Sequence, residues 1–270
     1  SAAAERVRRG INKRVEIPDF TARRDEIGHL SGALRDMTGA LYNRIDAIEA
    51  FAADVSHELK NPLTSLRSAV ETLAMVKTDE QRARLVEIVK HDVRRLDRLI
   101  TDISDASRLD AELARAETNP VDVARLLGAI TTLANETRKE NQAEIVLQVI
   151  PAGSNLDPLL AFVVLGHESR LSQVFRNLID NARSFTVENT RIHVRVRRSG
   201  RDVEIRVEDQ GPGIRPDNLD RIFERFYTDR PEGSFGKNSG LGLSISKQIV
   251  EAHKGRIWAE NRYGRAPEGV

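Results

Sequence analysis

Apolar residues between Phe51 and Leu73 recur at alternating spacings of four and three, which is typical of a helix packed in a bundle or coiled coil. This apolar seam consists of Leu59, Leu63, Leu66, Val70 and Leu73. Placing the seam at heptad positions a and d puts His57 at b, Glu58 at c and Asn61 at f, on the outward side. Pro62 removes one helical hydrogen bond, so we expect a bend beside these polar residues. The pattern predicts a helix whose exposed face carries an imidazole, a carboxylate and an amide.

A second amphipathic helix is predicted after a turn with capping residues at Lys77–Glu80. Its apolar seam consists of Leu85, Val89, Val93, Leu96, Ile100 and Ile103. Two helices with such a short connection pack as an antiparallel hairpin. A single hairpin cannot bury both seams, so we expect two copies to associate as a dimeric four-helix bundle.

Beyond Asn119-Pro120 the pattern changes to that of a mixed α/β domain. We predict helices over 121–139 and 169–183, a strand over 144–150, a β-hairpin that turns at Ser199-Gly200, a helix that ends at His253 and a strand over 255–260. The hairpin strands are indicated by Ile192, Val194 and Val196 and by Val203, Ile205 and Val207, which alternate with polar residues. The glycine-rich stretch from Gly233 to Ser239 is too polar for a core, and we expect it to act as a mobile lid.

Composition narrows the classes of function. The 270 residues allow two domains and a short N-terminal element, and their net charge of +1 gives no argument for nucleic acid. The chain has no cysteine, which excludes disulfides, thiolate metal sites and a cysteine nucleophile. The longest apolar run, residues 159–166, is far shorter than the roughly 20 residues that span a bilayer.

Two motifs in the α/β part carry oxygen atoms that suit the binding of a metal ion and of an adenine base. Asn177 and Asn181 are one helical turn apart, and amide oxygens are ligands that suit Mg²⁺, although such pairs also arise by chance. Asp209 follows a strand directly, where its carboxylate can accept a hydrogen bond from the exocyclic amine of adenine. Gly211 and Gly213 would let the backbone approach the base, but the same segment also fits an ordinary tight turn.

Two further motifs follow in the chain. In the segment 221–227, Phe223 and Phe226 would anchor a mobile loop, and core packing is the alternative. Gly240-Leu241-Gly242-Leu243 opens a helix, whose free amides and dipole favour phosphate. The sequence contains no GxxxxGK[ST] motif, so this is not a P-loop.

Taken in this order, the motifs resemble an orthodox two-component sensor histidine kinase over nearly the whole chain. Residues 51–66 are similar to the phosphoacceptor motif of that family. The segments similar to the nucleotide-binding motifs of its GHKL-type ATP-binding domain are 177–182, 209–213, 221–227 and 240–243. The resemblance implies an all-α antiparallel hairpin that forms a dimeric four-helix bundle, followed by an α/β-sandwich (α+β) GHKL/Bergerat ATP-binding domain.

Upstream, Asp25-Glu26-Ile27-Gly28 opens a helix that carries Ile27, Leu30, Leu34, Met37 and Leu41 at three-four spacing. This is similar to the latter part of a HAMP signalling module, whose second helix begins with an acidic DExG motif. The expected domains are therefore a partial HAMP and signalling helix over 1–45, a dimerisation and histidine-phosphotransfer hairpin over 46–115, and a catalytic ATP-binding domain over 120–270.

The resemblance also implies roles for single residues. His57 would be the phosphoacceptor, Glu58 would orient and deprotonate it, and Asn61 would position water for dephosphorylation of a partner. Asn177 and Asn181 would serve Mg²⁺. The implied nucleotide-binding residues are Asn177, Asn181, Arg183, Asp209, Gly211, Gly213, Phe223, Phe226, Gly240, Leu241, Gly242 and Leu243. The family pattern NAxKF has a lysine where this chain has Ser184, so a phosphate contact there must come from Arg183 or from elsewhere.

The activity implied is autophosphorylation of His57 by ATP, followed by phosphotransfer to an aspartate of a response regulator, with phosphatase activity besides. The expected partners are a second copy of the chain and that regulator. The full-length protein is expected to be anchored upstream in the inner membrane, with this chain as its cytoplasmic portion. Two rival functions are a non-catalytic GHKL ATP-binding scaffold and a GHKL ATPase or serine kinase whose hairpin is only a dimerisation stalk.

Overall fold

The structure is a computed structural model that describes residues 17–115, 117–151, 160–227 and 239–262. The chain divides into two compact units, residues 1–61 and residues 62–270. The first unit contains most of a long helix. The second contains the end of that helix, the second helix of the hairpin and the α/β part.

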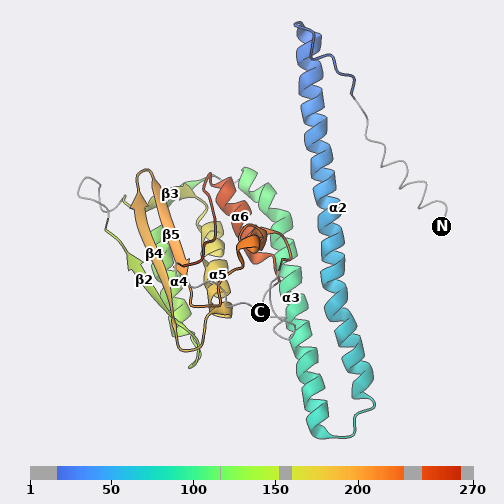
Figure 1. The fold of residues 1–270 in the computed structure, drawn as a ribbon, viewed down its shortest axis with the longest axis vertical. Helices are drawn as coiled ribbons and strands as arrows, with labels where there is room; N and C mark the ends of the chain where they lie inside the picture. The colour runs from blue at the N-terminus through green and yellow to red at the C-terminus, as the bar shows by residue number, and fades with distance from the viewer. Residues whose placement is uncertain (1–16, 116, 152–159, 228–238, 263–270) are drawn as a thin grey trace, which may run out of the picture. The chain divides into compact units, whose positions relative to one another are not determined.

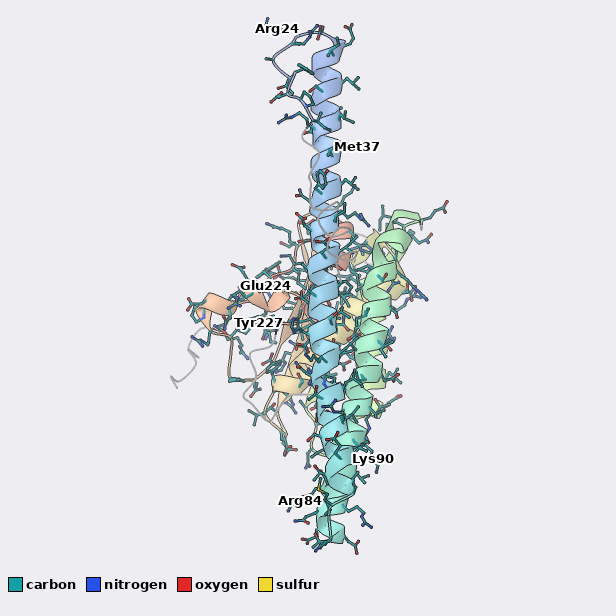
Figure 2. The ribbon with its side chains drawn as sticks, turned by 90° about the vertical axis from the view of Figure 1, so that its right-hand side faces the viewer. Arg24, Met37, Arg84, Lys90, Glu224 and Tyr227 are labelled. Carbon is teal, nitrogen blue, oxygen red and sulfur yellow. The ribbon has the colours of Figure 1, made fainter. Side chains whose placement is uncertain are left out.

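The long helix α2 (Glu26–Leu73) joins the predicted upstream helix to the predicted seam without a break, and Pro62 lies inside it. Along its N-terminal part, the apolar residues Ile27, Leu34, Leu41 and Ile48, spaced by seven, are exposed. Met37, which is labelled in Figure 2, is 67% exposed. A regular apolar stripe therefore remains uncovered on this helix.

The segment before α2 is fastened to the first turns of the helix. The Asp25 carboxylate accepts a hydrogen bond of 3.1 Å from the Gly28 amide, which satisfies a free N–H at the helix start. The Ser31 hydroxyl accepts a bond of 3.1 Å from the Phe20 amide and donates one of 2.9 Å to the Pro18 carbonyl. The acidic motif thus caps α2, and a buried serine holds the preceding chain against it.

The second helix of the predicted hairpin is α3 (Asp79–Arg115), and the turn before it is capped as predicted, since the Thr78 hydroxyl accepts a bond from the Gln81 amide. Within the second unit, part of the hairpin's apolar surface remains exposed. Its residues are Leu63 and Val70 on α2 and Val86, Val93 and Ile100 on α3, spaced by seven on each helix. We call these five residues the hairpin stripe. Arg84 and Lys90, labelled in Figure 2, also lie on α3 and are exposed.

The α/β part contains two sheets. In the three-stranded sheet, β2 (Glu144–Val149) runs parallel to β4 (Arg191–Ser199), and β5 (Asp202–Glu208) pairs with β4 antiparallel. The two-stranded sheet pairs β1 (Asn119–Asp122) with β3 (Val163–Gly166). The hairpin of β4 and β5 turns through Gly200 at φ +62°, as predicted.

The helices α4 (Val123–Glu136) and α5 (Glu168–Phe185) pack on the three-stranded sheet, and α6 (Gly242–Ala252) packs against α5 (Figure 1). The buried core contains Ile145, Ile192, Val194 and Val196 from the strands, and Val123, Leu127, Val174, Phe175, Ile179, Ile245 and Ile249 from the helices. Side chains on the other face of the sheet form ion pairs, such as Arg195 with Glu208 at 2.7 Å. The predicted α/β sandwich after a helical hairpin is therefore confirmed.

Two predicted elements differ from the structure. The helix predicted over 121–139 is shorter at both ends. Asp122 ends β1 and caps α4 by accepting bonds from the amides of Ala124 and Arg125, and α4 ends at Glu136. The strand predicted over 255–260 is wrong, since these residues are in no strand. A strand-like sequence does not by itself supply a backbone partner in a sheet. The predicted lid over 233–239 lies outside the described residues except for Ser239.

Within the described residues, no helix combines the length and the apolar character that would be needed to cross a membrane.

Candidate active site

The three polar residues of the first motif lie together on α2 in the first unit. His57 and Asn61 are exposed, as the heptad register predicts, and Glu58 is half-buried. A four-residue separation places His57 and Asn61 on one face of the helix. This arrangement presents an imidazole to solvent with a carboxylate as its neighbour in sequence.

The nucleotide motifs lie in the second unit, and the first of them connects α5 to α6. The Asn177 Nδ2 atom is 3.1 Å from the Gly242 carbonyl oxygen and 3.4 Å from the Ser246 hydroxyl. A carbonyl oxygen can only accept a hydrogen bond, so the amide nitrogen must face α6. The two motifs, which are far apart in sequence, are therefore brought together, and the Asn177 oxygen turns away from Gly242.

Asn181 follows one turn later on α5 and is half-buried. Among the described residues, no group of three or more His, Asp or Glu side chains could hold a metal. A magnesium ion bound here would therefore rely on amide oxygens together with phosphate oxygens. This agrees with the ordinary preference of Mg²⁺, which binds through few protein ligands and keeps several waters. The donor set present fits the ion.

The loop after β5 is closed by short contacts around Asp209. The Asp209 carboxylate accepts a bond of 2.7 Å from the Gly211 amide. Gly211 is buried, and a Cβ atom there would lie 2.9 Å from the Phe185 carbonyl oxygen, closer than side chains tolerate. A carboxylate has about four lone-pair sites, so the bond to Gly211 leaves Asp209 able to accept from an adenine amine.

Two polar side chains hold this loop in place from outside. The Thr186 hydroxyl accepts a bond of 3.1 Å from the Gln210 amide. Farther along, beyond Gly213 at φ +86°, the Asn261 side chain forms two bonds with the backbone of Ile214, at 2.8 and 2.6 Å. The loop is therefore fixed at both ends of its glycine segment.

The segment 221–227 is joined to the glycines before α6. The Phe226 amide donates a bond of 2.9 Å to the Gly240 carbonyl, and Phe226 itself has φ +59°. Gly240 has φ +75°, and a Cβ there would lie 2.8 Å from the Phe226 Cα. A side chain at Gly240 would therefore separate the two segments, which explains the glycine in physical terms.

Two aromatic rings of the segment 221–227 each have a cationic side-chain group over one face. The Lys247 ammonium of α6 lies 5.9 Å from the Phe223 ring centre, and the Arg221 guanidinium lies 4.9 Å from that of Tyr227. Glu224 and Tyr227 are labelled in Figure 2. Phe223 itself lies in the short helix η2 (Arg221–Phe223), which follows η1 (Pro216–Asn218). The segment is thus packed on α6 as well as on Gly240.

The glycine pair places backbone amides at the start of α6. Gly242 is the first residue of the helix, and Leu241 before it is almost completely buried. The Leu241 amide donates to the Ser239 hydroxyl at 3.2 Å, and Leu243 is half-buried. The two leucines anchor the loop, and the helix start supplies the partial positive charge that favours phosphate.

Arg183 is engaged elsewhere in this conformation. Its Nη2 atom donates a bond of 2.7 Å to the Ala134 carbonyl near the end of α4. Burial lowers the pKa of the Arg183 guanidinium, while the neighbouring Asp180 raises it. A phosphate contact through Nη2 of Arg183 would compete with the bond to Ala134.

Sequence reasoning missed four residues that shape the site, namely Thr186, Ser246, Lys247 and Asn261. Ser246 lies four residues after Gly242 on one helix face, and this spacing was the signal available for it. The partners of Thr186 and Asn261 are 24 and 47 residues away, so no local pattern indicates them.

Two family descriptions match separate parts of the chain. The His Kinase A (phospho-acceptor) domain matches residues 47–112, which include His57. The histidine kinase-, DNA gyrase B- and HSP90-like ATPase family matches residues 166–268, which include Asn177, Asp209 and Gly240. The chain therefore belongs to the two-component sensor histidine kinases, as the motifs predict.

Individual relatives agree with this class. Sensor protein ChvG of Rhizobium meliloti (strain 1021) is 59% identical over 268 residues, which cover 98% of this chain and 46% of the relative. Sensor protein ChvG of Agrobacterium fabrum (strain C58 / ATCC 33970) is 60% identical over 271 residues, which cover 98% of this chain and 45% of the relative. The chain thus spans less than half the length of these curated relatives.

One solved structure extends the likeness to the fold. The crystal structure of histidine kinase ThkA in complex with the response regulator protein TrrA superposes with a TM-score of 0.62 at 24% identity. The match covers 82% of this chain and 60% of that chain. It supports the order of a helical part followed by an α/β domain.

Proposed function

We propose that this chain is the kinase portion of a membrane-anchored sensor, which transfers the γ-phosphoryl group of ATP to His57 and then to an aspartate of a response regulator. The observation that carries the proposal is the exposed position of His57 within the phosphoacceptor match, on the same chain as a complete set of nucleotide motifs. The GHKL-type domain supplies ATP binding, and the hairpin supplies the acceptor.

In the proposed reaction, one ring nitrogen of neutral His57 attacks the γ-phosphorus. A nitrogen–phosphorus bond forms, the bond from phosphorus to the bridging oxygen breaks, and ADP leaves with that oxygen. Glu58 holds the proton on the other ring nitrogen and stabilises the imidazolium that develops. Asn61 lies on the same face but has no basic group, so its proposed role is to position water for dephosphorylation of the regulator.

In the nucleotide site, Asp209 would accept the adenine amine, while Gly211 and Gly213 keep the loop thin enough for the base to approach. The amides around Gly240 and Gly242 would bind phosphate oxygens, and the phenylalanines of the segment 221–227 would hold that loop on α6. Asn177 and Asn181 would hold Mg²⁺. When bound, the ion supplies charge neutralisation to the phosphates.

The hairpin stripe supports a homodimer as the assembled form. Its residues are spaced by seven on both helices and are exposed in the single chain, for example Val93 at 52% and Ile100 at 56%. In a four-helix bundle, the hairpin stripe of each copy would be buried against that of the other, which covers the exposed apolar side chains. The likeness to ThkA in complex with TrrA supports a response regulator as the further partner.

The N-terminal segment supports a connection to an upstream signalling element. The acidic motif at Asp25–Gly28 caps α2, and Ser31 holds the preceding segment on the helix, as a partial HAMP module would require. The ChvG relatives are more than twice as long as the matched region. We propose that this chain is the cytoplasmic portion of an inner-membrane sensor.

The chemistry of the phosphorylated product tests this function against its rivals. After incubation with labelled ATP, the protein is expected to carry phosphate that is labile in acid and stable in base, as phosphohistidine is. A scaffold would bind nucleotide without becoming labelled, and a serine kinase would produce an acid-stable, base-labile product. Either of those results would contradict the proposal.

A further inference from the structure

Ser246 on α6 is completely buried, and its hydroxyl makes two polar contacts. The hydroxyl donates a bond of 2.8 Å to the Gly242 carbonyl, one helical turn earlier. Its oxygen lies 3.4 Å from Nδ2 of Asn177, which is also 3.1 Å from the same Gly242 carbonyl. Asn177, Gly242 and Ser246 thus form a triangle of polar contacts between α5 and α6.

This triangle determines which end of the Asn177 amide faces α6. The Ser246 proton is used in the bond to Gly242, so Ser246 presents a lone pair to Asn177 and not a proton. The Gly242 carbonyl also presents a lone pair. Two acceptors therefore face the amide. Its NH₂ end satisfies both, whereas a flipped amide would set Oδ1 against two oxygen atoms.

We infer that Ser246 is a positioning residue for the metal site, because it holds the Asn177 amide with Oδ1 turned away from α6 and toward a magnesium ion bound with the nucleotide. The inference rests on the proposed role of Asn177. Ser246 acts through Asn177 and contacts neither the metal nor the phosphates. Fixing the amide before the ion arrives reduces the ordering that accompanies binding.

The helix offers a matched control for this role. Ser244 is also buried on α6, and its hydroxyl donates to a carbonyl of the preceding turn, that of Leu241 at 2.9 Å. Ser244 therefore resembles Ser246 in burial and in its bond within the helix, but its described bond is to Leu241 and not to Asn177. Replacement of either serine by alanine removes one hydroxyl from the core of the same helix.

The test measures the affinity of the protein for a non-hydrolysable ATP analogue in the presence of Mg²⁺ and in the presence of EDTA. The quantity compared among variants is the affinity in Mg²⁺ divided by the affinity in EDTA. In Ser246→Ala the ratio is expected to fall about fivefold, the loss typical of one buried hydrogen bond, while the affinity in EDTA stays near wild type. Ser244→Ala is expected to keep the wild-type ratio. In Asn177→Ala the ratio should fall, and adding Ser246→Ala should lower it no further.

Several results would overturn the inference. If Ser246→Ala and Ser244→Ala change the ratio equally, or if Ser246→Ala and Asn177→Ala act additively, Ser246 does not act through Asn177. If Asn177→Ala leaves the ratio unchanged, the metal role of Asn177 in the proposed function fails, and this inference fails with it. If Ser246→Ala loses nucleotide binding even in EDTA, Ser246→Cys replaces it as the test variant, because the larger side chain leaves no void. Ser246→Cys is also expected to lower the ratio. An unchanged ratio in Ser246→Cys would overturn the inference.

Discussion

At the scale of single residues, His57 and Asn61 share one exposed face of α2 but differ in the chemistry they can support. Asn61→Ala is expected to reduce dephosphorylation of the regulator more than phosphorylation of His57, because an amide orients water but cannot act as a base. Measuring both activities on the same preparation checks this. Ser65→Ala, one turn further along and also exposed, serves as the control. An equal loss of both activities in Asn61→Ala would indicate damage to the helix or to the docking surface.

A second residue-scale prediction concerns the acid–base behaviour of Asp102 on α3. Burial raises the pKa of Asp102 above its ordinary value of 3.8, although the hydrogen bond with Ser239 acts in the opposite direction. A carboxyl with a raised pKa binds more protons in the folded state, so stability falls as pH rises from 3.8 through the folded pKa. Asp102→Asn is therefore expected to increase the free energy of unfolding at neutral pH, and the gain should shrink as pH falls toward 3.8.

Denaturant unfolding of wild type and Asp102→Asn between about pH 4 and about pH 8 measures this difference. Asp97→Asn, at an exposed position on the same helix, is expected to change stability little at any pH. If Asp102→Asn lowers stability, or if its gain does not depend on pH, burial does not control the protonation of Asp102.

Residue positions were predictable where a local spacing carried the signal. The heptad register placed His57 and Asn61 outward, and four-residue spacing placed Asn177 and Asn181 on one helix. The contact between Asn177 and Gly242 spans 65 residues, and that between Arg183 and Ala134 spans 49. Such long-range contacts depend on how α4, α5 and α6 pack, which no spacing in the sequence expresses.

At the scale of elements, the proposed dimer depends on the hairpin stripe. Val93→Glu with Ile100→Lys is expected to raise the dimer dissociation constant by at least about tenfold, because burying one such side chain is worth about 1.5–3 kcal/mol. Sedimentation over a range of concentrations measures the change. Nucleotide binding should be retained, since both residues lie on α3 outside the nucleotide motifs.

An exposed apolar residue outside the stripe provides the control for this prediction. Leu133 on α4 is 61% exposed, and Leu133→Glu is expected to leave the dissociation constant unchanged. A dimer of wild-type affinity in the double variant of α3 would contradict the four-helix bundle.

Helices and strands could be predicted from the sequence where a single spacing of apolar residues runs through the whole element. The three-four seams correctly predicted the hairpin helices, and period-two alternation predicted β4 and β5. The strand predicted over 255–260 failed, because a strand also needs a partner edge. At 121–122 the chain pairs with β3 before α4 begins. The continuity of α2 through Pro62 agrees with the helix expected over Phe51–Leu73, in which this proline was placed inside the helix.

At the scale of the whole molecule, the proposed phosphoacceptor and the proposed nucleotide-binding motifs belong to different compact units. His57 lies in the unit of residues 1–61, and the nucleotide residues lie in the unit of residues 62–270. Nucleotide binding and acceptance of phosphate should therefore be separable by mutation. A variant that lacks the imidazole is expected to keep nucleotide binding and to lose phosphate labelling, whereas an ATPase with a helical stalk would carry no phosphohistidine in either protein.

The most direct measurement compares wild type and His57→Gln for incorporation of labelled phosphate from ATP, together with the affinity of each for an ATP analogue. We expect acid-labile labelling of the wild type and no labelling of His57→Gln, with the same nucleotide affinity in both proteins. Labelling of His57→Gln at the wild-type level would show that another residue accepts the phosphoryl group and that His57 is not the phosphoacceptor.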